Sequence, residues 1–398
     1  MVNEKTKLIS LYGILLIISV WAKNAFSAEK TTTGCDVNAF VVSKLIMVNS
    51  ETVFNGNPAS ICIEGYGGFR VRAGGKLILK NTTVTLLHNA SNKTGAAFIK
   101  LDPGSALRLT RVKIISNLET ATKEAVDKNT GALNIEGSEN VIAGETARDL
   151  GVRLEISDSF VISKHAYSTG GIFIKPSTKN AKGVSGWIVN TRFENTWSPI
   201  KLYGAKNFNV SNNVFKRNPG TNISISGTDV LISKNEIVFP GNGYIGDGIT
   251  IFNPLSESRI LENNITGGSC YGIWFYNSRF RNILVSRNRI SSGVTNGLNV
   301  SNNKKFKSHG LLIKENHFTA NAGFGVGIDS DVSGVTLASN YFIGNASSFG
   351  DFDIAISNTA VAVVKDDNIS AQKIDPNWAK ERSPNRTHVN ESIRVLRF

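Results

Sequence analysis

A short pattern recurs along the chain at intervals of about 25 residues from residue 171 onward. Each copy has a small residue, then apolar and other residues in alternation, then a polar turn. Successive side chains of a strand point to opposite faces, so this period of two predicts strands. A chain that repeats one strand and turn in this way is expected to stack its copies into a solenoid. The copies are GIFIKP (171–176), PIKLYG (199–204), NISISG (222–227), GITIFN (248–253), GIWFYN (272–277), GLNVSN (297–302), GVGIDS (325–330) and DIAISN (353–358).

A second pattern follows each first one and places an Asn at one position of every repeat. Coils of a solenoid are about 4.8 Å apart, so these amides could hydrogen-bond to one another as an internal ladder. Thr occupies this position in IVNTRF (188–193), and Asp occupies it in VKDDNI (364–369). The ladder residues are Asn213, Asn235, Asn263, Asn288, Asn316 and Asn340.

These two patterns together resemble the right-handed parallel β-helix family. The resemblance implies an all-β solenoid over residues 61–370, with looser repeats before residue 171. A sandwich or a propeller would instead need longer hairpins with two-residue turns. We expect residues 29–60 to cap the first coil, because an open end exposes unpaired strand edges. Residues 371–398 form a polar, basic C-terminal tail.

The N-terminus resembles a secretory signal, which we assign to residues 1–28. Lysines precede an apolar run at 8–22, and small residues for cleavage follow at Ser27 and Ala28. The run is short for a membrane span, although the sequence leaves an uncleaved anchor open. We therefore expect a periplasmic or secreted protein with no stable membrane span after cleavage.

The three cysteines indicate whether the protein could form a disulfide in an oxidising compartment. Cys35 and Cys62 could pair in an oxidising environment, which leaves Cys270 over. The sequence alone does not decide the pairing.

The chain is basic, with a formal net charge of +13. A basic surface attracts polyanions. On charge alone, the polyanion could be nucleic acid, anionic lipid or acidic polysaccharide, and a generally basic secreted protein is an equal alternative. The positive charges are spread between turns and form no dense block. Taken together with the family resemblance, we expect an acidic polysaccharide partner and no nucleic acid. The oligomeric state is undefined at this level.

The alternation also predicts which residues face outward. A solenoid core does not require aromatic residues on its outer surface, and an exposed apolar patch usually marks an interaction site. Aromatic rings can stack on sugars, while cations can pair with their carboxylates. The alternative is that long turns cover this surface and make it a satellite core. The proposed substrate-binding residues are Phe173, Lys175, Phe252, Trp274, Arg279, Arg281 and Asn299.

The resemblance also implies enzyme chemistry, of which lyase or epimerase action at uronates is one candidate. Both reactions begin by removing the C5 proton, which needs a base and stabilisation of the enolate. We assign Lys201 as the candidate base, with Tyr203 or Tyr276 in proton transfer. Arg279 and Arg281 could clamp the carboxylate.

The stretch YGIWFYN (271–277) departs from the epimerase pattern. Mannuronan C5-epimerases are similar in Tyr-Gly and in the downstream Asn strand, but carry Asp-Pro-His-Asp where this chain has WFYN. Glycosyl hydrolysis, as in polygalacturonase-like β-helices, is a second candidate reaction, with Asp247 as its candidate catalytic residue. Those enzymes carry paired Asp residues, of which only Asp247 is present here before Gly248. The departures favour a competing prediction: a non-catalytic polysaccharide-binding or exopolysaccharide assembly and export protein, or a surface adhesin.

Acidic residues at strand ends raise the question of calcium. Carboxylate pairs can hold this ion, and Asp329 and Asp331 form the candidate pair. Asp is also an ordinary turn residue. The sequence therefore indicates no definite cofactor.

Overall fold

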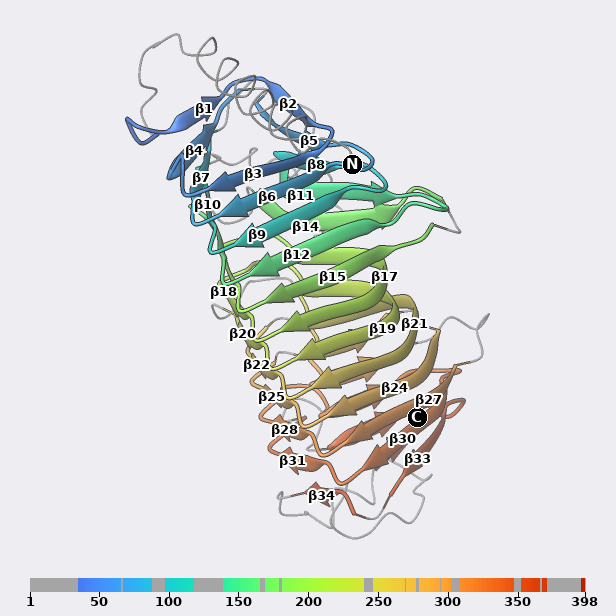
Figure 1. The fold of residues 1–398 in the computed structure, drawn as a ribbon. Coiled ribbons are helices and arrows are strands. Elements are labelled where there is room, and N and C mark those ends of the chain that lie inside the picture. The colour runs from blue at the N-terminus through green and yellow to red at the C-terminus, as the bar shows by residue number, and fades with distance from the viewer. Residues whose placement is uncertain are drawn as a thin grey trace, which may run out of the picture. The chain divides into compact units, whose positions relative to one another are not determined.

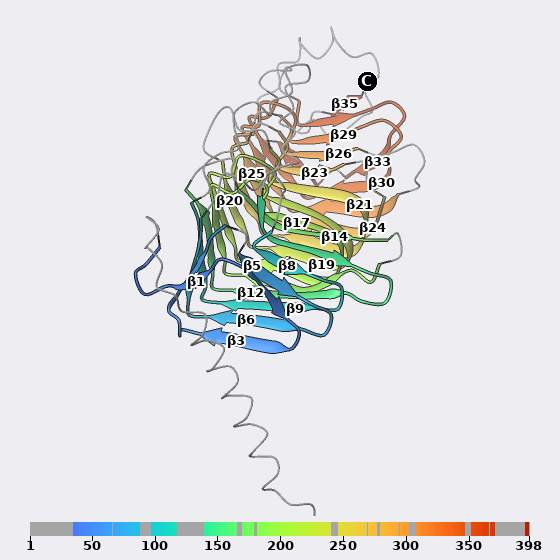
Figure 2. The same cartoon turned by 90° about the horizontal axis from the view of Figure 1, so that it is seen from above.

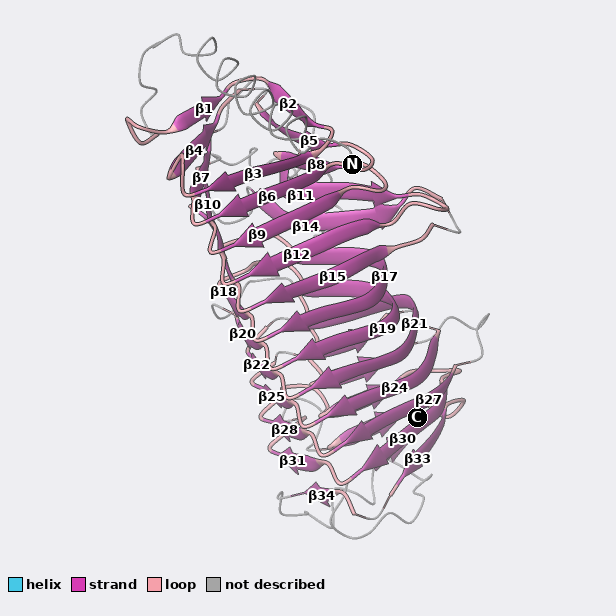
Figure 3. Ribbon diagram, in the orientation of Figure 1, coloured by secondary structure: helices cyan, strands magenta, loops and turns pink. Residues whose placement is uncertain are grey.

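The computed structural model describes residues 35–65, 67–87, 97–117, 139–164, 169–178, 181–239, 246–268, 270–276, 279–293, 295–301, 308–346, 352–365, 367–370 and 395–397. Every regular element among them is a strand (Figure 3). Across the same ranges, no helix has the length and apolar character that a membrane crossing requires. The proposed signal at 1–28 lies outside the described residues, as does most of the tail at 371–398.

The strands of the unit formed by residues 38–398 stack in parallel coils, with three strands per coil (Figure 1). Each strand pairs with the equivalent strand of the next coil, which produces three faces. We name them the first, second and third face. The third face is a separate 13-stranded sheet, whereas the first and second faces join through the long strands β17, β19 and β21 into one 22-stranded sheet.

The first face contains β2 (Leu45–Val48), β5 (Gly68–Val71), β8 (Ile99–Leu101), β11 (Glu139–Thr146), β14 (Thr169–Pro176), the first parts of β17 (Ile200–Ser211), β19 (Ile223–Ser233) and β21 (Ile249–Leu261), β23 (Ile273–Phe275), β26 (Leu298–Val300), β29 (Val326–Ile328), β32 (Ile354–Ile356) and β35 (Val395–Arg397). In Figure 2, β23, β26 and β29 follow one another toward β35. The second face contains β3 (Glu51–Asn55), β6 (Lys76–Lys80), β9 (Ala106–Thr110), β12 (Val152–Ser157), β15 (Val184–Val189), the later parts of β17, β19 and β21, β24 (Phe280–Ser286), β27 (His309–Lys314), β30 (Ser333–Ala338) and β33 (Val361–Val364). The third face contains β1 (Phe40–Val42), β4 (Ser60–Ile63), β7 (Thr83–Leu86), β10 (Lys113–Ser116), β13 (Phe160–Ser163), β16 (Arg192–Glu194), β18 (Val214–Lys216), β20 (Glu236–Val238), β22 (Asn264–Thr266), β25 (Arg289–Ser291), β28 (His317–Thr319), β31 (Tyr341–Ile343) and β34 (Ile369–Ser370).

The coils begin earlier than the sequence suggested. Strands β1, β2 and β3 pair with β4, β5 and β6, so residues 40–55, which we expected within a cap, form the first coil. Their side chains alternate like those of later coils, but the repeat is too degenerate there to recognise. Cys35 and Cys62 are both disulfide-bonded, as the sequence allowed, and Cys270 keeps its thiol.

The predicted core of the first face is confirmed. Every inward position is at most 1% exposed, because the alternation points one side of each strand into the solenoid. These residues are Ile172, Ile174, Ile200, Leu202, Ile223, Ile225, Ile249, Ile251, Ile273, Phe275, Leu298, Val300, Val326, Ile328, Ile354 and Ile356.

The Asn ladder is also confirmed, and it forms the turn between the second and third faces. Each ladder Asn is buried, and its side-chain N–H donates to the side-chain oxygen of the next ladder Asn at 2.9–3.0 Å. Thr191 precedes the ladder, and its backbone N–H donates to Asn213. The prediction of Asp at the last position is wrong. The last turn is one residue longer, so Asn368 rather than Asp367 accepts from Asn340.

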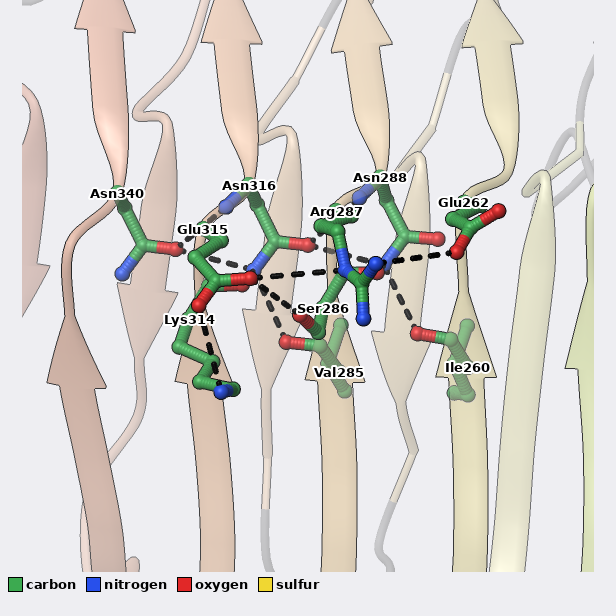
Figure 4. A network of polar contacts seen from close by, with 10 residues as sticks. All are labelled: Ile260, Glu262, Val285, Ser286, Arg287, Asn288, Lys314, Glu315, Asn316 and Asn340. Atoms are coloured by element: carbon green, nitrogen blue, oxygen red, sulfur yellow. Dashed lines mark hydrogen bonds and ion pairs between the residues drawn. The ribbon is translucent and has the colours of Figure 1, made fainter.

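The residue before each ladder Asn has a left-handed backbone conformation and faces solvent (Figure 4). Arg287 has φ 57°, and its guanidinium lies 3.4 Å from Glu262 and 3.5 Å from Glu315 on the neighbouring coils. Such exposed pairs contribute little to stability. The buried amides behind them are the stronger determinant of the turn, since an unpaired buried polar group is costly.

Glycine at the start of the first-face repeats has a steric cause. A Cβ on Gly272 would lie 2.4 Å from the side chain of Ile290, and one on Gly297 would lie 2.7 Å from Phe318. Both neighbours belong to the third face. The chain therefore passes close to that face as it turns into the first face, and a side chain at this position would clash.

Candidate functional site

Several of the predicted site residues lie on the outward side of the first face in two columns, and each member of the second column is two residues after a member of the first. Strand pairing places the first column in register from coil to coil, as the alternation predicted. Within it, Ser224, Thr250 and Asn299 are buried, whereas Phe173, Lys201 and Trp274 are partly exposed. The full column is Phe173, Lys201, Ser224, Thr250, Trp274, Asn299, Gly327 and Ala355.

Aromatic side chains on this surface contact one another in an unbroken series. Ring centroids are 6.1 Å apart for Phe173 and Tyr203, 5.5 Å for Tyr203 and Phe252, and 5.8 Å for Phe252 and Tyr276, all edge to face. The series continues through Trp274, 4.5 Å from Tyr276, to Tyr271, 5.0 Å from Trp274. We call these residues the aromatic strip: Phe173, Tyr203, Phe252, Tyr276, Trp274 and Tyr271.

The strip crosses one coil that contributes no ring. Tyr203 and Phe252 lie on β17 and β21, and β19 between them carries Ser226 at the corresponding position, after Ile225. Its hydroxyl accepts a hydrogen bond from the Gly204 N–H at 3.1 Å. The small serine leaves room for the two rings to meet above it, so the strip is continuous although its residues are not evenly spaced.

The Trp274 indole is held in place by a hydrogen bond. Its Nε1–H donates to the Ser301 hydroxyl at 3.1 Å, and that hydroxyl donates to the Phe275 carbonyl at 3.0 Å. Satisfying the polar edge of the indole fixes the orientation of its apolar face. A partly exposed ring in a fixed orientation is suited to stacking.

Lys201 lies beside the strip with its charge partly removed from water. Its Nζ is 5.7 Å from the centroid of the Phe173 ring, and burial lowers the pKa of its amine. Tyr203 follows two residues later on the same side of β17, and burial raises the pKa of its phenol. The pair therefore combines an amine that loses its proton more readily with a phenol that retains its proton.

Asp247 lies beneath this surface and is only 5% exposed. One carboxylate oxygen accepts from the Thr250 hydroxyl at 2.6 Å and the other from the Tyr271 N–H at 3.0 Å. Burial raises the pKa of Asp247, although these hydrogen bonds oppose the shift. The carboxylate thus links two successive coils below the strip.

We expect Asp247→Ala to lower the free energy of unfolding by about 1–3 kcal/mol, because it leaves buried donors without an acceptor. Asp247→Asn keeps one acceptor and carries no charge, so its cost should be smaller. A raised pKa means that the stability contributed by Asp247 is present at low pH and is lost as pH rises through the folded-state pKa. In urea unfolding, the free energy of unfolding of Asp247→Asn should therefore increase relative to that of the wild type between acidic and neutral pH. Equal losses in both variants would contradict this account.

Tyr271 belongs to this site but was not among the predicted residues. Burial, followed by the charges of Asp329 and Asp247, raises the pKa of its phenol. Tyr271 lies in the connection between β22 and β23, where the period of two does not apply. Its position immediately before the Gly272 repeat was the available signal.

Several predicted residues make other contacts. Arg281 lies on β24 of the second face and pairs with Glu257 at 3.2 Å, so it is not positioned as a clamp beside the strip. Lys175 is exposed and lies 3.5 Å from Glu145. Arg279 is exposed and precedes β24. Asn299 is 3% exposed, and its amide donates to Asp329 at 3.2 Å.

The candidate calcium ligands are separated by their turn. Asp331 has a left-handed φ of 62°, and its N–H donates to Thr359. Asp329 accepts the Asn299 amide, and burial raises its pKa. In the ranges that the structure describes, no group of three or more His, Cys, Asp or Glu side chains could hold a metal ion.

The parallel coils, their three faces and the internal Asn ladder define the class of protein. The fold of the chain is that of a right-handed parallel β-helix. Two family models match parts of it: "Right handed beta helix region" over residues 128–285, and "Periplasmic copper-binding protein (NosD)" over residues 255–359. No curated protein matches the chain.

Solved structures of the same fold are similar at low identity. The periplasmic alginate epimerase AlgG is 15% identical, with a TM-score of 0.46 over 85% of this chain and 77% of AlgG. Polygalacturonase from Erwinia carotovora ssp. carotovora is 12% identical, with a TM-score of 0.43 over 87% of this chain and 98% of that enzyme. The A-module of mannuronan C-5 epimerase AlgE4 from Azotobacter vinelandii is 11% identical, with a TM-score of 0.37 over 78% of this chain and 79% of that module.

Proposed function

We propose that this protein binds an acidic polysaccharide along the aromatic strip, outside the cytoplasm. The observation that carries the proposal is the unbroken series of partly exposed rings with Lys201 beside it. Rings in series offer stacking surfaces for successive sugars, and a cation beside them favours those that bear carboxylates. The periplasmic names of the NosD family and of AlgG agree with the predicted signal at 1–28.

The direct test is a binding panel. Polygalacturonate and alginate should bind, and neutral dextran should bind much more weakly, in titration calorimetry at low salt. Raising the salt concentration should weaken the acidic ligands selectively, because it screens their attraction to Lys201. Equal affinity for neutral and acidic polymers would contradict an acidic ligand.

Phe252→Ala should weaken polygalacturonate binding by roughly tenfold, the loss of about 1.4 kcal/mol expected for a central anchor. Phe252 is the ring that contacts both Tyr203 and Tyr276, so its removal divides the strip. Phe160→Ala is the matched control, since Phe160 is 45% exposed on β13 of the third face. An equal loss in both variants would mean that the strip is not the binding surface.

A second candidate function is modification of the bound polymer at its uronates. The lowered pKa of Lys201 favours it, because removal of the C5 proton needs a base, and the neighbouring Tyr203 phenol keeps a proton that it could donate. In this reaction the Lys201 amine would take the C5 proton. In β-elimination the resulting enolate would form the C4–C5 double bond and expel the C4 oxygen, which would take a proton from Tyr203 or Tyr276. In epimerisation the enolate would instead regain a proton at C5, on the opposite face, from Tyr203 or Tyr276. Binding without either product would favour an accessory role in polysaccharide assembly or export, or an adhesin.

The proposed function includes no copper site, although the description of the NosD family names copper. Copper sites in proteins are built from imidazole, thiolate or thioether ligands. The described residues bring together no group of three or more His, Cys, Asp or Glu side chains. They do not fit such a centre, and no step of the proposed function depends on it.

A further inference from the structure

The outward column that contains Lys201 and Trp274 continues onto coils that the sequence pattern left unassigned. Strand pairing aligns Arg70 with Lys100, Lys100 with Ala143, and Ala143 with Phe173, which in turn aligns with Lys201. Three coil steps therefore separate Lys100 from Lys201, or about 14 Å at the usual spacing between strands. One straight line on the first face joins these two lysines to the aromatic strip.

The upstream coils are positively charged on this side. Arg70 lies 3.1 Å and Arg72 lies 3.6 Å from the same Asp102 carboxylate, so two cations share one anion. Lys100 is exposed between its neighbours, and no ion pair between described residues includes it. These coils therefore present uncompensated positive charge to solvent.

The downstream end of the same side is acidic. Asp329 directly follows β29, three coil steps beyond the strand that carries Phe252, and part of its surface is exposed to solvent. Like charges repel an approaching carboxylate, and unlike charges attract it. Along the coil axis, the first face thus runs from cations through aromatic rings to the Asp329 carboxylate.

We propose that an anionic polysaccharide bound on the aromatic strip extends upstream across Lys100 and the Arg70–Arg72 pair, and does not extend across Asp329. This inference rests on the proposed function and adds the direction and extent of the bound polymer. It gives the strip the role of holding sugar rings and the upstream coils the role of holding their charges. Long acidic chains should then bind more tightly than short ones.

The test uses size-fractionated oligogalacturonates with the full protein. Lys100→Gln should weaken the long fraction roughly two- to fivefold, as for one exposed charge pair, and leave the short fraction unchanged. It should also reduce the salt dependence of the long fraction. Lys113→Gln is the matched control, because Lys113 is also exposed but lies on β10 of the third face.

The outcomes separate this inference from the function on which it rests. Oligogalacturonates that bind through the strip, with the same effect of Lys100→Gln at every length or none at any length, would overturn the upstream extension alone. A Lys113→Gln loss equal to that of Lys100→Gln would also overturn it. Failure of all lengths to bind to the wild type would overturn both proposals.

Discussion

Replacing Asn288 with Ala should lower the free energy of unfolding by about 2–5 kcal/mol, since several buried polar groups lose their partners at once. The side-chain oxygen of Asn288 accepts hydrogen bonds from both the backbone N–H and the side-chain amide of Asn263, at 3.0 and 2.9 Å. Its amide donates to Asn316 and to the Ile260 carbonyl, each at 2.9 Å. Ala can make none of these bonds, and water has no access to replace them.

The control for this prediction is the exposed neighbour of a ladder residue. Asn264→Ala on β22 removes the same functional group from the outer surface, where the effect of a substitution is usually within about 0.5 kcal/mol. Urea unfolding followed by circular dichroism should therefore separate the two variants clearly. Equal midpoints would mean that the ladder does not stabilise the coils as its geometry indicates.

The fold was predictable from residue 171 onward because two independent periods agree there. Alternation with period two identified the inward residues, and the recurring Asn fixed where each coil turns. Both signals follow from contacts that every coil repeats, as the bonds from Asn263 to Asn288 and from Asn288 to Asn316 illustrate. The pattern fails at Asp367, because the last turn has one extra residue and the ladder position therefore moves from Asp367 to Asn368.

The site was less predictable because it depends on side chains from different coils. The columns could be derived from alternation, but the ring contacts across Ser226 could not, since they depend on how far each side chain reaches. Arg281 was misplaced for a related reason. It follows Tyr276 closely in sequence, yet the chain turns a corner between them and carries Arg281 onto the second face. Lys100 was not among the predicted residues because the coils before residue 171 vary in length, so the repeat does not define their register.

Binding and catalysis make different demands on this surface. Stacking and charge attraction require only that the rings and cations remain accessible, and the register provides this over several coils. Proton transfer requires one base and one acid at a single sugar. Burial lowers the pKa of Lys201, which favours it as the base, and the Tyr203 phenol lies on the same side of β17. A variant that removes the amine but keeps the rings therefore distinguishes the two functions.

If the protein modifies uronates, Lys201→Ala should lower turnover at least about a hundredfold, the usual contribution of a general base. Binding should weaken only about two- to fivefold, since the variant loses one charge and keeps every ring of the strip. Ultraviolet absorbance of the unsaturated product would follow β-elimination, and proton NMR of the polymer would follow the C5 configuration. Lys206→Ala is the matched control, because Lys206 is exposed on the same strand, outside the two columns.

The pH dependence of turnover gives an independent check on the role of Lys201. A base must be deprotonated, so turnover should rise with pH through the Lys201 pKa. Because burial lowers that pKa, the rise should come at lower pH than for an ordinary lysine. Binding should change in the opposite direction, since the charged amine attracts the carboxylate. Unchanged turnover in Lys201→Ala would remove Lys201 from the mechanism, whereas tight binding by a wild-type protein that forms neither product would favour the accessory or adhesin role.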